Sequence, residues 1–408
     1  MKRILMTIAL TAGIMTYAGG FRVSLQGVKQ LAMAHTSAHA EDASVAFFNP
    51  AGISFIPSKL SISAGGFAVA NKVTFQNTST LQQTETDNPM GTPIYAAVAY
   101  KVLDNLSVGF SFATPFGSTI EWPSTWEGSD MVQKLELKSY YFQPMISVKL
   151  APWASFGASY IYAMGKVDWT TSLTQYGGQL NLLDDKAKGH GFGFGFYFQP
   201  DNQWDVSVAY RSPVDMKAKE GKATFTVPSS LLANFNNGTD NFKATLPLVD
   251  EVTIGATYKV TPKWLISADF NYHGWERYNK LTLDFEKVAA GNQPNDPTIK
   301  VSPKNFKNTK TFRLGTQYMI TDMIAGRLGA YYDESPYGDS DFIPETPSFD
   351  NYVITGGVGL KFNKIGVDIS GAYAMPQSRT FNNAYYNFAG QAKAKVFYFG
   401  LGFSYNAF

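Results

Sequence analysis

The sequence predicts an all-β protein: a transmembrane antiparallel β-barrel of about 14 strands with an N-terminal plug, or hatch, inside its lumen. Three observations support this fold. Aromatic residues make up 15% of the chain and Gly contributes 36 of 408 residues, whereas charged residues make up only 16%. Many segments alternate between apolar and small or polar residues, as strands between two different environments do. Short and long connections also alternate along the chain, which is typical of a barrel whose turns lie at one end and whose loops lie at the other.

The N-terminus has the layout of a secretory signal peptide, which we predict to be residues 1–18. Lys2 and Arg3 precede an uncharged run and the small residues at positions 18–20. Removal of this peptide leaves equal numbers of basic and acidic residues, so the mature chain has no overall charge that favours nucleic acid. The chain has no Cys, which excludes disulfides and thiolate chemistry.

Residues 19–57 do not alternate, and we expect them to form the hatch. The stretch 24–40 is compatible with a helix, and Asn49-Pro50-Ala51-Gly52 is typical of a turn. A periplasmic tail is the alternative. The apolar residues that follow position 46 favour burial in the lumen.

Residues 58–408 are predicted to form the barrel. One segment places Val252, Ile254 and Ala256 on one face and Thr253 and Gly255 on the other. Long connections are expected around residues 78–91, 120–133, 171–186, 219–249, 288–308, 334–350 and 376–391. Beyond the signal peptide the sequence has no uncharged stretch long enough for a membrane helix, so any span must be a strand. The expected location is the outer membrane of a Gram-negative bacterium, with outer-membrane lipid around the barrel. A soluble β-sandwich is the alternative.

Four stretches resemble one family: EDASVAFFNPAG (41–52), TPFGSTIEW (114–122), residues 249–283 and residues 310–347. They are similar to the FadL-type outer-membrane transporters of hydrophobic compounds, which include long-chain fatty acid and aromatic hydrocarbon channels. The resemblance implies passive uptake of a hydrophobic small molecule. The ligand would meet a groove between the third and fourth long loops, then a pocket against the hatch, and would leave sideways at a kink of the third strand.

The resemblance also implies roles for particular residues. The hatch movement would involve Asn49, Pro50 and Ala51, and Pro115 and Gly117 would kink the third strand because Pro cannot donate a ladder hydrogen bond. The expected ligand contacts are Phe47, Phe48, Ile53 and Phe55 of the hatch, Leu180 and Leu183 of the third loop, and Leu231, Leu232 and Phe235 of the fourth loop. Alternatively, the leucines pack the loops on each other, and the Pro-Gly pair ends the strand at the rim.

We expect no catalytic residues, metal or cofactor, and a monomeric protein that is not an enzyme. Asp269 and His273 lie four residues apart on one strand, about 14 Å by strand rise, which is too far for an acid-base pair. His35 and His39 have helical spacing but no evident third metal ligand. Two other functions stay open: a porin-like or structural barrel with a static plug, and an outer-membrane hydrolase. The hydrophobic substrate is not specified by the sequence.

Overall fold

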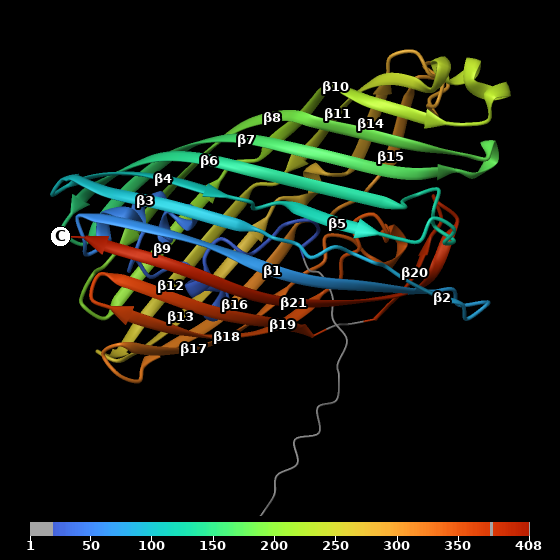
Figure 1. Ribbon diagram of the computed structural model, residues 1–408. Helices are drawn as coiled ribbons and strands as arrows, with labels where there is room; N and C mark the ends of the chain where they lie inside the picture. The colour runs from blue at the N-terminus through green and yellow to red at the C-terminus, as the bar shows by residue number, and fades with distance from the viewer. Residues whose placement is uncertain (1–18, 376–377, 408) are drawn as a thin grey trace, which may run out of the picture.

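The computed structural model describes residues 19–375 and 378–407, so the predicted signal peptide lies outside the described residues. The chain forms a closed antiparallel β-barrel (Figure 1). Each of fourteen strands pairs with its neighbours, and β21 pairs with β1 along its length to complete the ring. The ring consists of β1 (Leu60–Gln76), β3 (Ile94–Leu103), β4 (Leu106–Ala113), β6 (Lys134–Ala151), β7 (Ala154–Leu173), β8 (Gly178–Phe198), β9 (Trp204–Arg211), β12 (Glu251–Thr261), β13 (Trp264–His273), β16 (Thr309–Met319), β17 (Ile324–Asp333), β18 (Asn351–Phe362), β19 (Ile365–Met375) and β21 (Phe388–Ala407).

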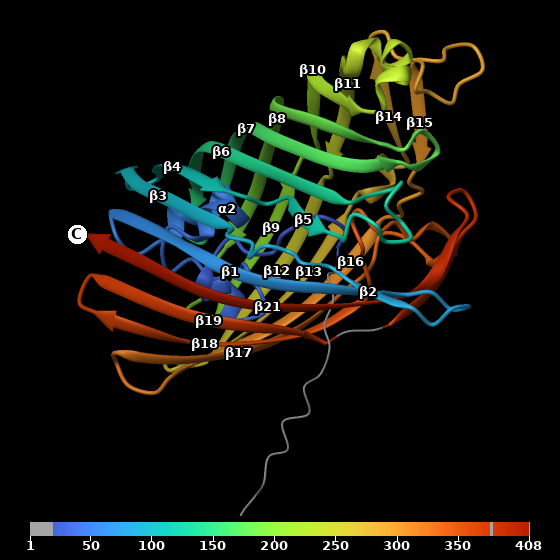
Figure 2. The ribbon, with the colours of Figure 1, turned by 45° about the vertical axis from the view of Figure 1, so that its right-hand side comes forward.

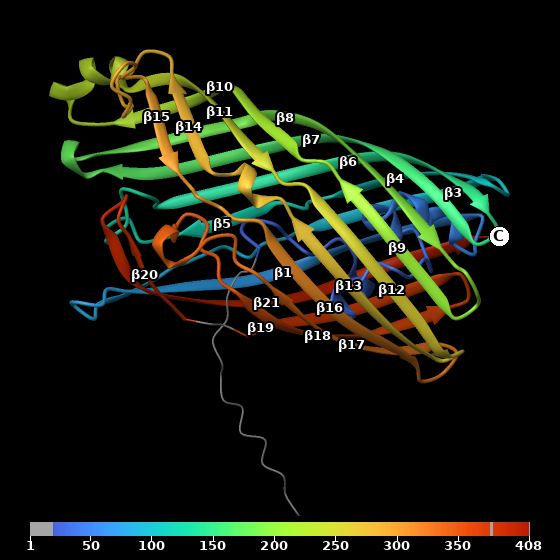
Figure 3. The ribbon, with the colours of Figure 1, turned by 180° about the vertical axis from the view of Figure 1, so that it is seen from behind.

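Shorter strands extend the barrel wall toward the long loops, as the view from behind shows (Figure 3). They are β2 (Gln83–Glu85), β5 (Gly117–Glu121), β10 (Val214–Thr226), β11 (Thr239–Leu248), β14 (Lys280–Phe285), β15 (Ile299–Pro303) and β20 (Arg379–Asn383). Four 3-10 helices lie in the connections between strands: η2 (Thr174–Tyr176), η3 (Ser229–Gly238), η4 (Trp275–Arg277) and η5 (Asp339–Asp341).

Two predicted long loops are therefore wrong. Most of 171–186 belongs to β7 and β8, and most of 219–249 belongs to β10, η3 and β11. These segments resemble loops in composition because the exposed face of the strands is polar there, as Asp185, Lys186 and Lys188 of β8 show.

Short turns and long connections lie at opposite ends of the barrel. The turns at 104–105 and 363–364 lie at the end that also holds the C-terminus (Figure 1). The outer face is apolar: Phe397 and Phe399 of β21 are each 55% exposed, whereas Gly400 and Gly402, which follow them on the same strand, are buried. This alternation places an apolar surface against lipid and small residues toward the lumen.

None of the helices within the described residues has the length and apolar character needed to span a membrane.

The segment before β1 lies inside the barrel (Figure 2). Its elements are α1 (Val28–Ala32), α2 (Val45–Phe48) and η1 (Pro50–Phe55). The expected helix over 24–40 is reduced to the five residues of α1, because Ala34 and His35 adopt positive φ values of 59° and 63°. A left-handed backbone cannot continue an α-helix, and it turns the following residues toward the wall.

Candidate functional site

An apolar cavity of about 100 Å³ lies between the N-terminal segment and the long loops. Residues of β6, β7, β8, β10, β11 and β14 form its walls, among them Lys138 and Lys166, and Phe21 and Phe116 form part of its lining on the side of the N-terminal segment. Lys304, Glu345 and Thr346 come from the loops and add polar groups to it. The remaining lining is mostly apolar, so the cavity suits a hydrophobic molecule.

The third strand of the ring is interrupted beside this cavity. β4 ends at Ala113 and β5 begins at Gly117, and the N-terminal segment replaces the missing ladder partner on one side. The amide of Val23 donates to the carbonyl of Pro115 at 2.8 Å, and the amide of Gly117 donates to the carbonyl of Phe21 at 2.9 Å. The interruption at Pro115 and Gly117 therefore leaves backbone groups that this segment satisfies.

A second cavity, of about 320 Å³, lies at the same interruption. Its lining includes Ile94, which is 48% exposed on the outer face, and Tyr331 and Val353, which are buried on the lumen side. The lining therefore includes side chains from both faces of the wall. Phe116 and Gly117 line both cavities.

The turn at Asn49 fixes the N-terminal segment to the wall. Asn49 Nδ2 donates to the carbonyl of Phe196 at 2.9 Å and to Ser207 Oγ at 2.8 Å, and Asn49 Oδ1 accepts from the amide of Ala51 at 2.9 Å. Ser155 Oγ donates to the carbonyl of Ala51 at 2.8 Å. Asn49, Pro50 and Ala51 are fully or nearly fully buried.

Glycines of the wall make room for this segment at two places. Gly157 and Gly195 lie opposite each other on β7 and β8, and a Cβ at either position would clash with residues 49–51. Gly315 and Gly329 form a second such pair on β16 and β17, facing the backbone of residues 33 and 34. A side chain at these positions would exclude the plug, which explains why the inner face is rich in Gly.

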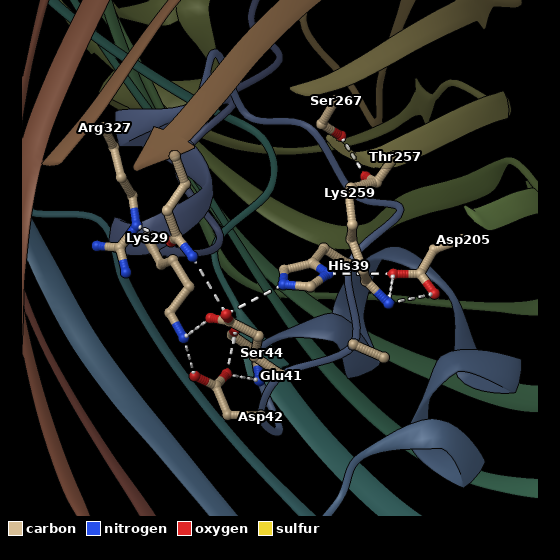
Figure 4. A network of polar contacts seen from close by, with 12 residues as sticks. Lys29, His39, Glu41, Asp42, Ser44, Asp205, Thr257, Lys259, Ser267 and Arg327 are labelled. Atoms are coloured by element: carbon tan, nitrogen blue, oxygen red, sulfur yellow. Dashed lines mark hydrogen bonds and ion pairs between the residues drawn. The ribbon is translucent and has the colours of Figure 1, made fainter. Parts of the chain in front are cut away.

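A network of ionic and hydrogen-bonding groups connects the segment to the wall strands β9 and β16 (Figure 4). Lys29 Nζ lies 2.7 Å from a carboxylate oxygen of both Glu41 and Asp42. His39 Nε2 lies 3.0 Å from Glu41 Oε1, and His39 Nδ1 lies 3.1 Å from Oδ2 of Asp205 on β9. Because these charges are largely removed from water, their pairing offsets a large desolvation cost, and breaking one pair would leave an uncompensated charge.

The protonation of two histidines in this segment follows from their neighbours. Burial alone would lower the pKa of His39, but the carboxylates of Glu41 and Asp205 outweigh it and raise the pKa to about 9. Burial, with the nearby Arg313, lowers the pKa of His35 well below its ordinary range. His39 is therefore a cation at neutral pH, and neutral His35 accepts a hydrogen bond from the amide of Gln26 at 3.3 Å.

Asp269 and His273, which lie on one strand, have different partners. Asp269 accepts hydrogen bonds from the amide and hydroxyl of Ser37, whereas His273 contacts Glu251 and Thr311. Across residues 19–375 and 378–407, no group of three or more His, Cys, Asp or Glu side chains is arranged to hold a metal ion.

The predicted hatch contacts divide into two groups. Phe47 and Phe48 line a small cavity with Arg211, whose guanidinium lies 4.0 Å from the centre of the Phe47 ring. Ile53 and Phe55 instead belong to a cluster with Tyr197, whose ring centre lies 5.4 Å from that of Phe55. This cluster does not line the apolar cavity between the N-terminal segment and the long loops.

The predicted loop contacts are also divided. Leu180 and Leu183 lie on β8 rather than in a loop, and Leu183 points outward with 38% exposure. Leu182, one residue earlier, lines the apolar cavity. Leu180 packs in one cluster with Leu231 and Phe235 of η3, and Leu232 is half-buried beside them.

Sequence reasoning missed the residues that line the cavity most directly. Phe116 lies between Pro115 and Gly117, so the predicted kink was a sequence signal for its position. Leu182 is in the predicted third loop together with Leu180 and Leu183, and the two-residue period of a strand places it on the same face as Leu180. Lys304 and Glu345 lie 41 residues apart and carry no local signal.

Comparisons with known proteins agree with this architecture. Residues 8–407 match the model of the family described as outer membrane protein transport protein (OMPP1/FadL/TodX). The chain is 24% identical to the long-chain fatty acid transport protein of Salmonella typhi over 424 residues, covering 95% of this chain and 94% of that protein.

Two solved structures share the fold. A FadL homologue from Pseudomonas aeruginosa superposes with a TM-score of 0.82 at 17% identity and covers 95% of this chain and 100% of its own. The toluene transporter TodX from P. putida gives 0.74 at 14% identity, with 96% and 99% covered. The family match spans nearly the whole sequence, so the chain belongs to the outer membrane protein transport family that includes FadL and TodX.

Proposed function

We propose that this protein takes up hydrophobic small molecules passively across the outer membrane, through a pocket gated by the hatch and a lateral exit in the wall. The observation that carries the proposal is the pair of adjacent cavities that Phe116 and Gly117 both line: one lies between the hatch and the loops, and the other lies at the interruption of the third strand. The relatives named for transport of long-chain fatty acids and toluene support a hydrophobic substrate of one of these classes.

The physical advantage of a lateral exit follows from the cost of exposing apolar surface. Leaving an apolar environment for water costs about 25 cal/mol per Å² of apolar surface. A molecule that passes from the pocket through the wall reaches the lipid without crossing the water-filled end of the barrel. The cavity on the other side of the hatch contains the charged side chains of Lys29, Arg327 and Asp368 in its lining.

In this proposal residues 1–18 are the signal peptide, 19–57 the hatch and 58–408 the barrel, which acts as a monomer and not as an enzyme. Residues 21–23 form the gate, because their backbone bonds to residues 115–117 close the interruption of the third strand. Asn49, Pro50 and Ala51 are the anchor about which the hatch rearranges. The half-buried Leu231 and Leu232 at the outer end offer a first apolar contact.

A static plug in a porin-like or structural barrel is the second candidate. Its support is the number of side chains that fix the hatch to the wall, including Thr355, which accepts a hydrogen bond from the amide of Ala34 at 3.0 Å, and Arg313, which donates to the carbonyl of Ala34 at 3.1 Å. The two candidates differ in whether transport needs the hatch to move.

A disulfide between hatch and wall distinguishes them. A Cβ at Gly402 would lie 3.0 Å from that of Val28, so small adjustments bring Val28→Cys and Gly402→Cys into bonding distance. Because the natural chain has no Cys, the pair forms a single defined bond.

We expect the oxidised double variant in proteoliposomes to lose uptake of radiolabelled oleate and toluene, and a reductant to restore it. The two single variants serve as controls for the substitutions themselves. Undiminished uptake by the oxidised protein would contradict the gating proposal and favour a route that does not need the hatch to move.

A further inference from the structure

The polar end of the apolar cavity has hydrogen-bonding capacity that the protein leaves unused. Lys304, Glu345 and Thr346 line the cavity, and each is at most 5% exposed. Lys304 Nζ donates to Glu345 Oε1 at 2.5 Å. Glu345 Oε2 and Thr346 Oγ1 are buried and have no hydrogen-bond partner within the described part of the chain.

The three groups need different hydrogen-bonding partners from a ligand. Glu345 Oε2 is an acceptor and needs a donor, whereas a lysine ammonium has three donors and is not exhausted by one carboxylate oxygen. The Thr346 hydroxyl can do either. An apolar group placed against these atoms would leave their capacity unused, which is unfavourable for buried polar groups.

The charges at this end cancel. Lys304 and Glu345 together are neutral, so the ammonium is not available to balance a second carboxylate. An ionised ligand carboxylate beside Glu345 would meet a like charge in surroundings of low dielectric constant. A hydroxyl group is neutral and can both donate and accept a hydrogen bond. It therefore avoids the repulsion from Glu345 and also satisfies the buried polar atoms.

We propose that Glu345, Thr346 and Lys304 make this cavity selective for apolar molecules that carry a hydroxyl group, such as alcohols and phenols, over those that carry an ionised carboxylate. This inference rests on the proposed function and narrows its substrate class. The ligand hydroxyl donates to Glu345 Oε2 and accepts from Lys304 or Thr346, and its apolar body contacts the wall near Leu182 and Phe242.

The test compares three probes of equal chain length: 1-octanol, octanoate and octane. Their dissociation constants are measured for the full mature protein in nanodiscs at pH 8, with empty nanodiscs correcting for partitioning into lipid. We expect octanol to bind at least about tenfold more tightly than octanoate, because the site's buried polar groups discriminate by hydrogen bonding.

Two variants separate recognition from a merely structural role of the ion pair. Glu345→Gln removes the negative charge and frees Lys304, so the preference for octanol over octanoate should fall by about tenfold or reverse. Damage to the loops would instead weaken the binding of octanol and octanoate by similar factors. Thr346→Val should weaken the binding of octanol and leave the affinity for octane unchanged. Asp339→Asn is the matched control, because it removes the same charge from the same loop at an exposed position outside the cavity.

Equal affinity of the natural protein for octanol and octanoate would overturn the inference, as would an unchanged preference in Glu345→Gln. Binding of octane alone would also overturn it, while leaving the proposed function in place. Binding of none of the three probes would contradict the proposed function and this inference with it.

Discussion

Asn49 of the hatch and Gly195 of the wall fit together because Gly195 has no side chain. A Cβ at Gly195 would clash with Asn49 Oδ1, and the same asparagine donates to the carbonyl of Phe196, the next residue on β8. A wall glycine and a hatch amide thus determine together how closely the plug approaches the barrel.

Substituting Gly195→Ala should displace the turn at Asn49. Overpacking of a buried contact costs about 1–3 kcal/mol, so we expect a lower thermal unfolding midpoint in detergent and faster tryptic cleavage within the hatch. Gly371→Ala is the matched control, because a Cβ at that wall position would lie 3.6 Å from its nearest neighbour, the carbonyl of Tyr398. Equal effects of the two substitutions would contradict this account.

Substituting Asn49→Ala should loosen the same contact by removing hydrogen bonds rather than by adding volume. Leaving buried partners unsatisfied costs about 1–3 kcal/mol. Liposome swelling with small sugars should detect the resulting leak through the lumen. Asn234→Ala, at an exposed position in η3, should leave both stability and swelling unchanged. If liposomes with the Asn49→Ala variant swell no faster than those with the natural protein, the other contacts of the hatch are sufficient to keep the lumen closed.

Substituting Phe116 should change the passage between the two cavities. Phe116→Ala removes a ring that lines both cavities and, at a cost of about 3–5 kcal/mol of stability, should raise the uptake rate per folded molecule. Phe116→Trp should lower that rate. Uptake of labelled substrate into proteoliposomes, normalised to folded protein, measures both. Transport at the natural rate in both variants would exclude a lateral route at this residue.

The stability of the hatch should depend on the protonation of His39. Its pKa is raised from the ordinary value to about 9, so the cation is favoured in the folded protein. The stabilisation is therefore fully present below about pH 6.5, the unfolded value, and is lost as the pH rises through about 9.

Unfolding midpoints measured from pH 6 to pH 10 should fall in the natural protein across this range, and the fall should be smaller in His39→Gln. Glu41 and Asp205 face His39 directly and Lys259 reaches Asp205 at 3.2 Å, so these groups contribute to the same profile. If the unfolding midpoints of the natural protein and of His39→Gln fall equally with pH, the pH dependence of stability comes from other groups.

The division between loop and strand was the least reliable part of the sequence-based prediction. The polar neighbours of Leu180 and Leu183 predict a long loop, but β8 begins at Gly178. Polarity reports the medium that a segment faces and not its backbone conformation. A strand that rises beyond the apolar part of the barrel has the same composition as a loop.

The sequence by itself determined the barrel, because the two-residue alternation and the alternating connection lengths are local consequences of a wall between two media. Only the tertiary structure decided which side chains meet in the lumen, such as Lys304 with Glu345 or Asn49 with Gly195. Those contacts join residues far apart in the chain, and a shift of one residue in register would turn each inward side chain outward.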